Sequence, residues 1–416
     1  MRSRPLSAAI SVPLSVATSN PGLSADLYWP TRVQEVSSNH PGEPWGETRM
    51  EIQSMKCAII VPLIITSMAS GVSEQGVIRA WGSNEWGQCA VPLDLDAVTS
   101  VAASQSFSVA VTPTGDFRCW GGIPGYDYGQ CAAPADLQPL RAIATGMCCH
   151  VVALQVDGTV RAWGRNNYGE CNVPLDLGQA KAVSAGAAHS TAIRMDGGLR
   201  AWGWNDWGQC NVPIDLALGG VVAVSAGEDH TVAVQSLGEV RAWGRNSHGA
   251  VNVPADMDAI TAVAAGSEFT VALTTAGAVR AWGWNYLGQC DVPPDLGTAT
   301  AIAAGHAHAV ALRSDGTVRA WGHNFSGECD VPTNLGPCLA VAAGARHTAV
   351  VERRCDCQSS LDSNCLVDGA DLGLMLNAWG PCIGGAPGCT GDLTGDGNVA
   401  GDDLGMLLSH WGPCPN

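Results

Sequence analysis

The sequence has 416 residues, of which only 14% are charged, and it contains 51 glycines. This composition favours an all-β protein with many tight turns. The formal net charge of −17 would repel nucleic-acid backbones and anionic lipid headgroups, so it argues against both as partners. No apolar run approaches the roughly 18 residues of a spanning helix, and no membrane span is expected.

The longest apolar run, residues 57–65, has the features of a signal peptide. The pair Met55-Lys56 precedes it, and small residues that suit cleavage end at Ala69. We therefore predict a signal peptide over residues 55–69.

Residues 1–54 are rich in Pro and Ser and show no hydrophobic pattern. We interpret them as an overcalled or disordered N-terminal extension, with translation starting at Met55. The alternative places the signal at residues 6–16, behind Arg2 and Arg4. Both interpretations predict a secreted, extracellular or cell-surface protein.

An internal repeat organises residues 70–353. The tryptophan of the motif Ala-Trp-Gly, in which Cys once replaces Ala, recurs at intervals of 39, 43, 39, 41, 39 and 39 residues, at positions 81, 120, 163, 202, 243, 282 and 321. Each unit contains short strand patterns such as Val-Arg-Ala-Trp, and the Asp-Gly pairs lie between two such patterns, at 157–158, 196–197 and 315–316. Units of about 40 residues made of short strands are typical of propeller blades.

The phase of the repeat predicts a closed ring. Residues 77–81 form an outgoing strand with no preceding partner, whereas residues 347–351 form a hairpin partner with no outgoing strand. Joining the two completes one blade and leaves no open edge. A solenoid would need capping ends, which this pattern lacks. We therefore expect an all-β, seven-bladed β-propeller over residues 70–353.

The sequence motif of the repeat resembles that of a known family. Ala-Trp-Gly-x-Asn-x-x-Gly-Gln followed by Ala-Ala-Gly-x-x-His is similar to the regulator of chromosome condensation repeat, over roughly residues 72–353. The short unit and its Val-Pro segment are most similar to the secreted bacterial beta-lactamase inhibitory proteins of the second type. The resemblance implies a propeller that binds protein partners through one face. The export signal and the acidic charge do not suit nucleotide exchange in the nucleus.

The segment after each Ala-Trp-Gly varies between units and collects aromatic residues. We predict that these form a ligand-binding face, because equivalent propeller loops emerge at one end. The alternative is that some of them only cover a blade edge. The predicted face consists of Trp86, Tyr126, Tyr128, Tyr168, Trp204, Trp207, Trp284, Tyr286 and Phe325.

Three other in-phase sets are interpreted as structural. The histidines at 150, 189, 230, 308 and 347 share their position with Phe107 and Phe269, which indicates a packed site with the imidazole bonded to backbone. The arginines at 79, 118, 161, 200, 241, 280 and 319 are expected to stack or form ion pairs between blades. The cysteines at 89, 131, 171, 210, 290 and 329 are expected to be small buried fillers, too far apart to bond one another.

Residues 354–416 contain a second, duplicated unit. Each copy has a short amphipathic helix that stops at Gly-Pro, and the second is preceded by a loop in which Asp392, as position 1, begins the calcium-loop spacing. This loop-helix unit resembles a dockerin repeat. The resemblance implies a small α-helical module that binds Ca²⁺ and docks on a cohesin-like scaffold, with the metal held by Asp392, Thr394, Asp396, Asn398 and Asp403.

The first copy departs from that pattern, since Ser360 replaces the leading Asp and Cys365 replaces the turn Gly, so metal binding there is left open. The six cysteines of the tail permit up to three disulfides, and their connectivity is also open.

Motifs of the common catalytic classes are absent from the sequence. We therefore predict a binding protein, not an enzyme. Its propeller face would engage a protein or glycan, and its tail would attach it to a scaffold or surface. The alternative is a secreted hydrolase or lyase in the propeller channel. That enzyme would need carboxylates or histidines unique to individual blades, and the sequence pattern places these residues in phase instead.

Overall fold

The computed structural model describes residues 76–125, 127–147, 149–353, 359–361, 366–367, 369–382 and 389–413. The predicted signal peptide and N-terminal extension therefore lie outside the described residues, as do Tyr126 and much of the first tail loop. No helix in the described ranges is both long enough and apolar enough to cross a membrane.

Between residues 76 and 353, the described residues form seven three-stranded antiparallel sheets of the kind that is typical of propeller blades. Three of them are β2 (Ser100–Ala103), β3 (Phe107–Val111) and β4 (Phe117–Gly121); β5 (Leu140–Thr145), β6 (His150–Gln155) and β7 (Val160–Gly164); and β8 (Ala180–Ala185), β9 (His189–Arg194) and β10 (Leu199–Gly203).

Three further sheets follow in chain order. They are β11 (Val221–Ala226), β12 (His230–Gln235) and β13 (Val240–Gly244); β14 (Ile260–Ala265), β15 (Phe269–Thr274) and β16 (Val279–Gly283); and β17 (Ala299–Ala304), β18 (His308–Arg313) and β19 (Val318–Gly322). A short helix, α1 (Ile214–Leu218), lies in the connection from β10 to β11.

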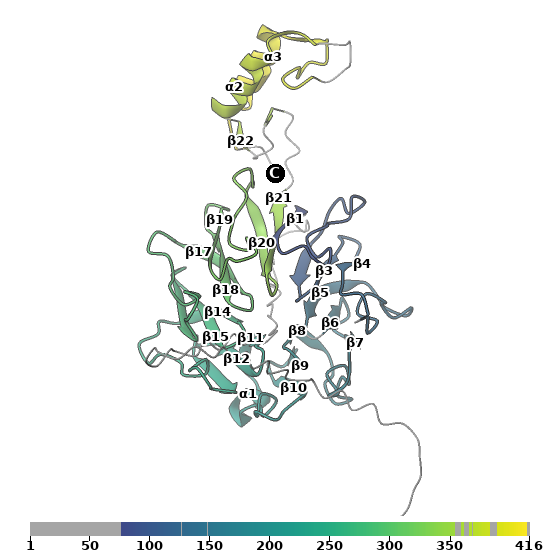
Figure 1. Cartoon of the computed structure of the whole chain (residues 1–416), viewed down its shortest axis with the longest axis vertical. Helices are drawn as coiled ribbons and strands as arrows, with labels where there is room; N and C mark the ends of the chain where they lie inside the picture. Colours follow the sequence, from purple (N-terminus) through teal and green to yellow (C-terminus); the bar gives the residue numbers. More distant parts are fainter. Residues whose placement is uncertain are drawn as a thin grey trace, which may run out of the picture. The chain divides into compact units, whose positions relative to one another are not determined.

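The last sheet joins the two ends of the repeat region. It combines β20 (Cys338–Ala343) and β21 (His347–Arg353) with β1 (Gly76–Gly82). Ile78 pairs with Val351 and Trp81 with Thr348, so the predicted pairing of residues 77–81 with the end of the repeat region is confirmed. Figure 1 shows β1 beside β21, with the sheets following one another around the body in chain order.

The first strands of the sheets contact one another in a closed cycle. Each contacts the first strand of the next sheet, from β2 through β5, β8, β11, β14 and β17 to β20, and β20 contacts β2 again. These strands and the middle strands are built from Ala and Val with some Ile and Leu, and most of their residues are buried. Small residues such as Ala and β-branched residues such as Val suit this position, because two sheet faces must approach closely there.

Three of the hairpins that join second to third strands use the predicted Asp-Gly pairs. Gly158, Gly197 and Gly316 have φ values of +87°, +85° and +86°, which favour glycine. At 157–158 the Asp157 carboxylate also accepts a hydrogen bond from the Thr159 amide, at 2.8 Å. The sequence signal for these turns is therefore confirmed.

The tail forms two helices and two minimal sheets. Helices α2 (Gly369–Asn377) and α3 (Gly401–Ser409) each precede a two-residue strand at Gly-Pro, β23 (Gly380–Pro381) and β25 (Gly412–Pro413). These strands pair crosswise with β24 (Asn398–Val399) and β22 (Leu366–Val367). Val367, Met375, Val399 and Leu407 form the shared core, which explains why the unit occurs as a duplicate.

Candidate functional site

The variable segments that follow each Ala-Trp-Gly all leave the end of the third strand of a sheet. We call them the outer loops, and they span residues 82–89, 121–131, 164–171, 203–210, 244–251, 283–290 and 322–329. The loops that join first to second strands, the inner loops, lie at the same end. For example, the Arg245 amide bonds the Asp229 carbonyl and the Trp284 amide bonds the Glu268 carbonyl, at 2.8 and 2.9 Å.

The described residues of the predicted face lie on these outer loops. Tyr286 and Phe325 are 83% and 88% exposed. Trp86, Tyr128, Tyr168 and Trp207 are also exposed, whereas Trp204 and Trp284 are half-buried. The prediction of one aromatic-bearing end of the propeller therefore agrees with their positions, while Tyr126 lies outside the described residues.

Part of this aromatic set connects neighbouring loops. The Tyr168 and Trp204 rings lie 5.6 Å apart, the guanidinium of Arg245 lies 5.1 Å from the Trp207 ring, and the His248 and Trp284 rings lie 6.2 Å apart. In each pair, one residue belongs to an outer loop and the other to the next loop along the chain. Trp204 and Trp284 therefore contact the neighbouring outer loop.

Each outer loop except one is closed by its own side chains. A Gln or Glu accepts the amide of the residue two positions earlier, as in Trp207 to Gln209 at 3.0 Å. The following cysteine thiol reaches back to a loop carbonyl, as in Cys210 to Trp204 at 3.2 Å. Burial raises the pKa of this thiol to about 12. The expectation that these cysteines are small buried fillers is therefore corrected, because they are half-buried and their thiols donate hydrogen bonds.

Cys131 is a further correction, because it forms a disulfide with Cys119. Cys119 is the residue that replaces Ala in the second Ala-Trp-Gly motif. The other in-phase cysteines are free, whereas this out-of-phase partner of Cys131 lies on the adjacent strand β4. The disulfide fixes the longest outer loop, which carries Tyr128.

The outer loop at 244–251 lacks both closing side chains. Ala250 replaces the Gln or Glu, and Val251 replaces the cysteine. Two inner loops hold it instead: Arg245 forms ion pairs with Asp229 at 3.1 Å and Glu268 at 3.5 Å, and His248 Nδ1 lies 2.9 Å from Glu268. We call these four residues the Arg245 cluster.

The sequence interpretation missed this cluster. Asp229 and Glu268 are only 5% and 9% exposed, and they occur at the inner-loop position that is Cys149, Ala188 or Ala307 in other units. An acidic residue thus occupies this inner-loop position in two adjacent units only. The usable signal was the departure of residues 249–251 from the Gly-Gln-Cys pattern.

The in-phase histidines are structural, as predicted, but their partners are hydroxyls of the next sheet and not backbone. His189 Nε2 lies 3.0 Å from Thr231 Oγ1, and this hydroxyl donates to the Gln209 carbonyl at 2.9 Å. Trp243 Nε1 donates to the same carbonyl at 3.0 Å. Burial lowers the pKa of His189 to about 3, so the ring is neutral and serves as a packing and hydrogen-bonding element.

The in-phase arginines form ion pairs, as predicted, but the expectation that these pairs join neighbouring blades is wrong. Each binds the connecting segment that enters its own sheet, not a residue of a ligand site. The pairs are Arg118–Asp94, Arg161–Asp136, Arg200–Asp176, Arg241–Asp215, Arg280–Asp256 and Arg319–Asp295. Arg79 differs, because it contacts Asn334 at 3.2 Å and Glu352 at 3.6 Å.

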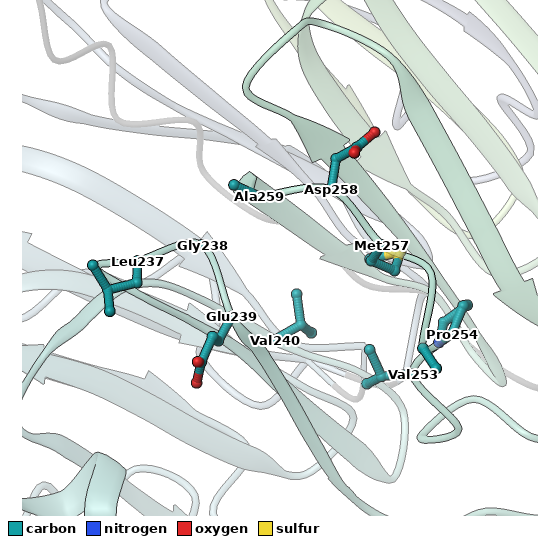
Figure 2. Close-up of a pocket in the computed structure, with 10 residues that line it drawn as sticks. Leu237, Gly238, Glu239, Val240, Val253, Pro254, Met257, Asp258 and Ala259 are labelled. Atoms are coloured by element: carbon teal, nitrogen blue, oxygen red, sulfur yellow. The ribbon is translucent and has the colours of Figure 1, made fainter.

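A hollow of about 300 Å³ lies at the opposite end of two sheets. Figure 2 shows Leu237 and Glu239, from the hairpin of β12 and β13, across from Val253, Pro254 and Met257, which precede β14. None of the predicted face residues lines it. Its open, mainly aliphatic lining marks a groove between neighbouring sheets.

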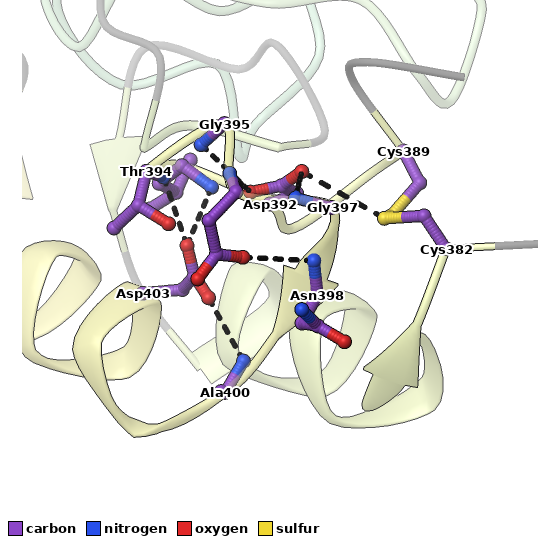
Figure 3. The surroundings of a disulfide bond; sticks show 11 residues. Cys382, Cys389, Asp392, Thr394, Gly395, Gly397, Asn398, Ala400 and Asp403 are labelled. Atoms are coloured by element: carbon purple, nitrogen blue, oxygen red, sulfur yellow. Dashed lines mark hydrogen bonds between the residues drawn. A yellow bond between two sulfur atoms is a disulfide. The ribbon is translucent and has the colours of Figure 1, made fainter. Parts of the chain in front are cut away.

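In the tail, the predicted calcium loop turns around the Asp392 carboxylate (Figure 3), which accepts the amides of Gly395, Asp396 and Gly397 at 2.7, 3.1 and 3.0 Å. Gly397 has a φ of +87°, as the sharp turn of such a loop requires. The Asp396 carboxylate accepts the Asn398 amide at 2.8 Å.

Asp403 closes the same loop. Its carboxylate accepts the amides of Leu393, Thr394 and Ala400 at 2.8, 2.9 and 2.8 Å. Burial would raise the pKa of the Asp403 carboxyl, but these hydrogen bonds lower it below its ordinary value. Asp371 holds the Leu361 amide in the equivalent place of the first unit, at 2.6 Å.

Among the described residues, Cys382, Cys389 and Asp392 form a group whose potential ligand atoms lie within 4.8 Å of one another. The two cysteines are joined in a disulfide, so they offer no thiolates to a metal. The oxygen-rich donor set of Asp392, Thr394 and Asp396 fits calcium better than a thiolate-binding metal.

Comparison with known proteins identifies the repeat. The family model of the regulator of chromosome condensation (RCC1) repeat matches residues 180–209, 221–250, 260–289 and 299–328, so the chain contains RCC1 repeats. Each match begins at the first residue of the first strand of a sheet and ends in the outer loop that follows the third strand. A search of the curated proteins finds no match.

Solved propellers share the fold. Prp20p from Saccharomyces cerevisiae, described with its binding to Gsp1p and histones, is 16% identical, with a TM-score of 0.58 over 69% of this chain and 93% of that chain. Yeast RCC1 (Prp20), solved with Kap60 bound to it, is 17% identical, with a TM-score of 0.58 over 70% and 91%. Human WBSCR16 is 20% identical, with a TM-score of 0.55 over 71% and 98%.

Proposed function

We propose that the chain is a secreted or surface-attached binding protein and not an enzyme. Its seven sheets are the blades of a closed seven-bladed propeller, and the outer-loop end takes a protein or glycan partner. The tail is a dockerin-like, calcium-binding module that attaches the molecule to a cohesin-like scaffold or to a surface.

The observation that carries this proposal is the contrast within each unit. The framework residues repeat and bond one another, whereas exposed Trp86, Trp207, Tyr286 and Phe325 occupy the variable outer loops. Aromatic side chains on a rigid scaffold offer large contact area at low entropic cost, and they dominate protein interfaces. The similar yeast propeller that was solved with Kap60 supports a protein as the partner.

Export is supported by the disulfides Cys119–Cys131 and Cys382–Cys389, because such bonds persist mainly in oxidising compartments. The hydrolase or lyase alternative would rest on Asp229 and Glu268, which occupy the same position in two adjacent units. Both carboxylates are paired with Arg245, an arrangement that fixes charge for binding.

The face is tested by replacing Trp86, Trp207 and Tyr286 singly with Ala. The partner is captured from the surface or medium of the producing cell. Each variant is expected to weaken the binding of this partner by about 1–3 kcal/mol, as for interface hot spots. Binding is measured by calorimetry, and unchanged circular dichroism shows that the fold is retained. Leu175→Ala is the matched control, because this side chain is fully exposed outside the outer loops. Equal affinity of all three variants and the parent would move the site elsewhere.

The tail is tested by calcium titration of the full chain. The proposal assigns side-chain oxygens of Asp392, Thr394, Asp396 and Asp403 and the Asn398 carbonyl to the metal. Asp396→Ala removes one carboxylate, so calorimetry should show weaker binding or none. Asp402→Asn, next to the loop's last ligand, is the control that should bind as the parent does. Calcium binding that survives Asp396→Ala unchanged would mean that the loop is misassigned.

A further inference from the structure

The end of the propeller opposite the outer loops, which we call the hairpin end, departs from the repeat in three adjacent sheets. The hairpins between second and third strands lie there, and the first strands begin there. The residue after the second strand is polar in two sheets, as Thr275 and Ser314. After β6 and β9 it is Val156 and Met195, 66% and 60% exposed, and Leu237 in the hairpin after β12 is 82% exposed. Exposed apolar side chains therefore gather on one part of the cycle of sheets.

The connection that contains α1 joins two of these hairpins. The Ser236 amide, in the hairpin of β12 and β13, donates to the Gly220 carbonyl at 2.8 Å. On the other side, the Val221 amide donates to the Gly197 carbonyl, in the hairpin of β9 and β10, at 3.0 Å. The exposed apolar side chains of the three sheets and α1, which we call the hairpin patch, are Val156, Met195, Leu218, Val222 and Leu237. Leu237 also lines the hollow of about 300 Å³ (Figure 2), so the patch continues into a depression that can receive an apolar side chain.

Two cations lie at the start of the first strands of the same sheets. Arg141 in β5 and Lys181 in β8 occupy the equivalent irregular position, and these two strands contact each other. Among the described residues, neither side chain has an ion-pair partner. The nearby hairpin carboxylates bind other groups: Asp196 pairs with Arg194 at 2.6 Å, and Asp157 accepts a backbone amide of its own hairpin at 2.8 Å. The two cations are thus able to pair with carboxylates from outside the chain.

Backbone hydrogen bonds hold these cations next to the apolar side chains. The Val156 amide donates at 3.0 Å to the Pro139 carbonyl, two residues before the cation of its sheet. The Met195 amide donates at 3.0 Å to the Gln179 carbonyl, again two residues before the cation. Apolar area and positive charge therefore form one surface across two neighbouring sheets.

We propose that the hairpin patch and its two cations form a second interaction surface, which binds an acidic segment of a protein partner that also presents apolar side chains. Charge complementarity selects this occupant. A carboxylate would pair with Arg141 or Lys181, whereas a neutral or basic segment would cover a cation without neutralising it. Exposed apolar side chains favour a protein over nucleic acid, whose backbone the net charge of −17 would also repel. Because this surface lies opposite the outer loops, the inference does not rest on the proposed function.

The test begins with a disulfide-closed random peptide library, displayed on phage and selected on the purified full chain at about 150 mM salt. Peptides that also bind the double variant Met195→Ser, Leu237→Ala are removed. Both replacements copy the residues at equivalent positions of other hairpins, Ser314 and Ala276, so the hairpins should keep their structure. The remaining peptides depend on the patch, and we expect them to be enriched in Asp or Glu next to apolar residues.

The cations are then tested with representative peptides by calorimetry. The double variant Arg141→Thr, Lys181→Thr copies Thr261 and Thr300, which hold the same position in β14 and β17. Affinity should fall at least about tenfold, with unchanged circular dichroism. Arg346→Thr is the matched control, because it removes an exposed cation from an inner loop at the opposite end. It should leave affinity unchanged, and replacing the peptide's carboxylates with amides should reproduce the loss.

Three results would overturn the inference. A library that yields no patch-dependent peptide would remove the surface. Patch-dependent peptides that lack acidic residues, or that bind the cation variant as tightly as the parent, would assign the patch to a purely apolar partner. Sedimentation of the parent, but not of the cation variant, with vesicles of phosphatidylserine and phosphatidylcholine would assign it to an anionic membrane. Trp207→Ala separates the two surfaces, because it should leave the affinity of these peptides unchanged whether or not it weakens binding at the outer loops.

Discussion

At five places where neighbouring sheets meet, a buried histidine bonds a hydroxyl of the next sheet, as His230 does with Thr270 and His347 does with Ser108. At the other two places the histidine is Phe107 or Phe269, and the facing residue is Val151 or Ala309, which carry no hydroxyl. The chain thus changes both members of the contact together.

The outer loops follow a different rule. Their exposed residues change from Trp to Tyr to Phe without any matching change in the framework. This difference separates structure from function in a repeat. Compensated variation, in which both contacting residues change together, marks an interior contact. Uncompensated variation marks a surface whose residues contact something outside the chain.

The largest expected effect is the loss of stability at low pH, which acts on the buried histidines of the interior contacts and not on the outer loops. Burial lowers the pKa of His150, His189 and His347 to about 3, and of His230 and His308 to about 4, from an ordinary value of 6.5. The unfolded chain therefore binds more protons, and stability present above pH 6.5 is lost as the pH falls toward 4. Each histidine should contribute a loss on the order of 3 kcal/mol at pH 4.

Five such terms, about 15 kcal/mol together, reach the upper end of the stability of ordinary domains, so urea unfolding should show a steep fall in the free energy of unfolding between pH 6.5 and 4. Carboxyl groups whose pKa is lowered in the fold lose their contribution as the pH falls below their ordinary pKa of about 4, so most of the loss above pH 4.5 comes from the histidines. The outer-loop aromatics carry no charge, so Trp207→Ala should follow the parent's pH profile. A free energy of unfolding that stays flat down to pH 4 would show that the imidazoles are not buried as neutral groups.

A double-mutant cycle at His230 and Thr270 tests whether the two members of one interior contact are energetically coupled. Thr270→Ala leaves the His230 Nε2 donor buried without a partner, at an expected cost of about 1–3 kcal/mol. Adding His230→Phe reproduces the Phe269–Ala309 pair and should recover part of that loss, measured by urea unfolding. Losses that simply add would mean that the two residues are not coupled.

Much of the fold could be predicted because the repeat itself is redundant. The Trp spacing, the Asp-Gly turns and the complementary ends at residues 77–81 and 347–351 each predicted the sheets and their closure. The structural role of the histidines followed from Phe107 and Phe269 sharing their position. Their hydroxyl partners did not, because a contact between sheets joins residues about 40 positions apart, and no local pattern shows which of them face each other.

The site was predictable only in outline. Variation of the outer loops identified Trp207 and Tyr286, but the Arg245 cluster depends on how two inner loops approach one outer loop. Likewise, Cys119 looked like a plain exchange for Ala, and its disulfide with Cys131 required the position of the adjacent strand. Residues that break a repeat were the informative ones, and the contacts that give them meaning are long-range.

The smallest expected effect concerns the arginine pairs on the outside of the framework. Arg319 contacts both carboxylate oxygens of Asp295, at 3.1 and 3.0 Å, but both side chains are largely exposed. Exposed ion pairs contribute about 0.2–1 kcal/mol, because water screens the attraction and the side chains lose freedom. Asp295→Asn copies the natural pair of Arg79 with Asn334, so the free energy of unfolding should fall by no more than about 1 kcal/mol. The difference between variant and parent should shrink further in 1 M salt. A loss as large as that of Thr270→Ala would place the arginine pairs with the interior contacts and would blur the distinction between compensated and uncompensated positions.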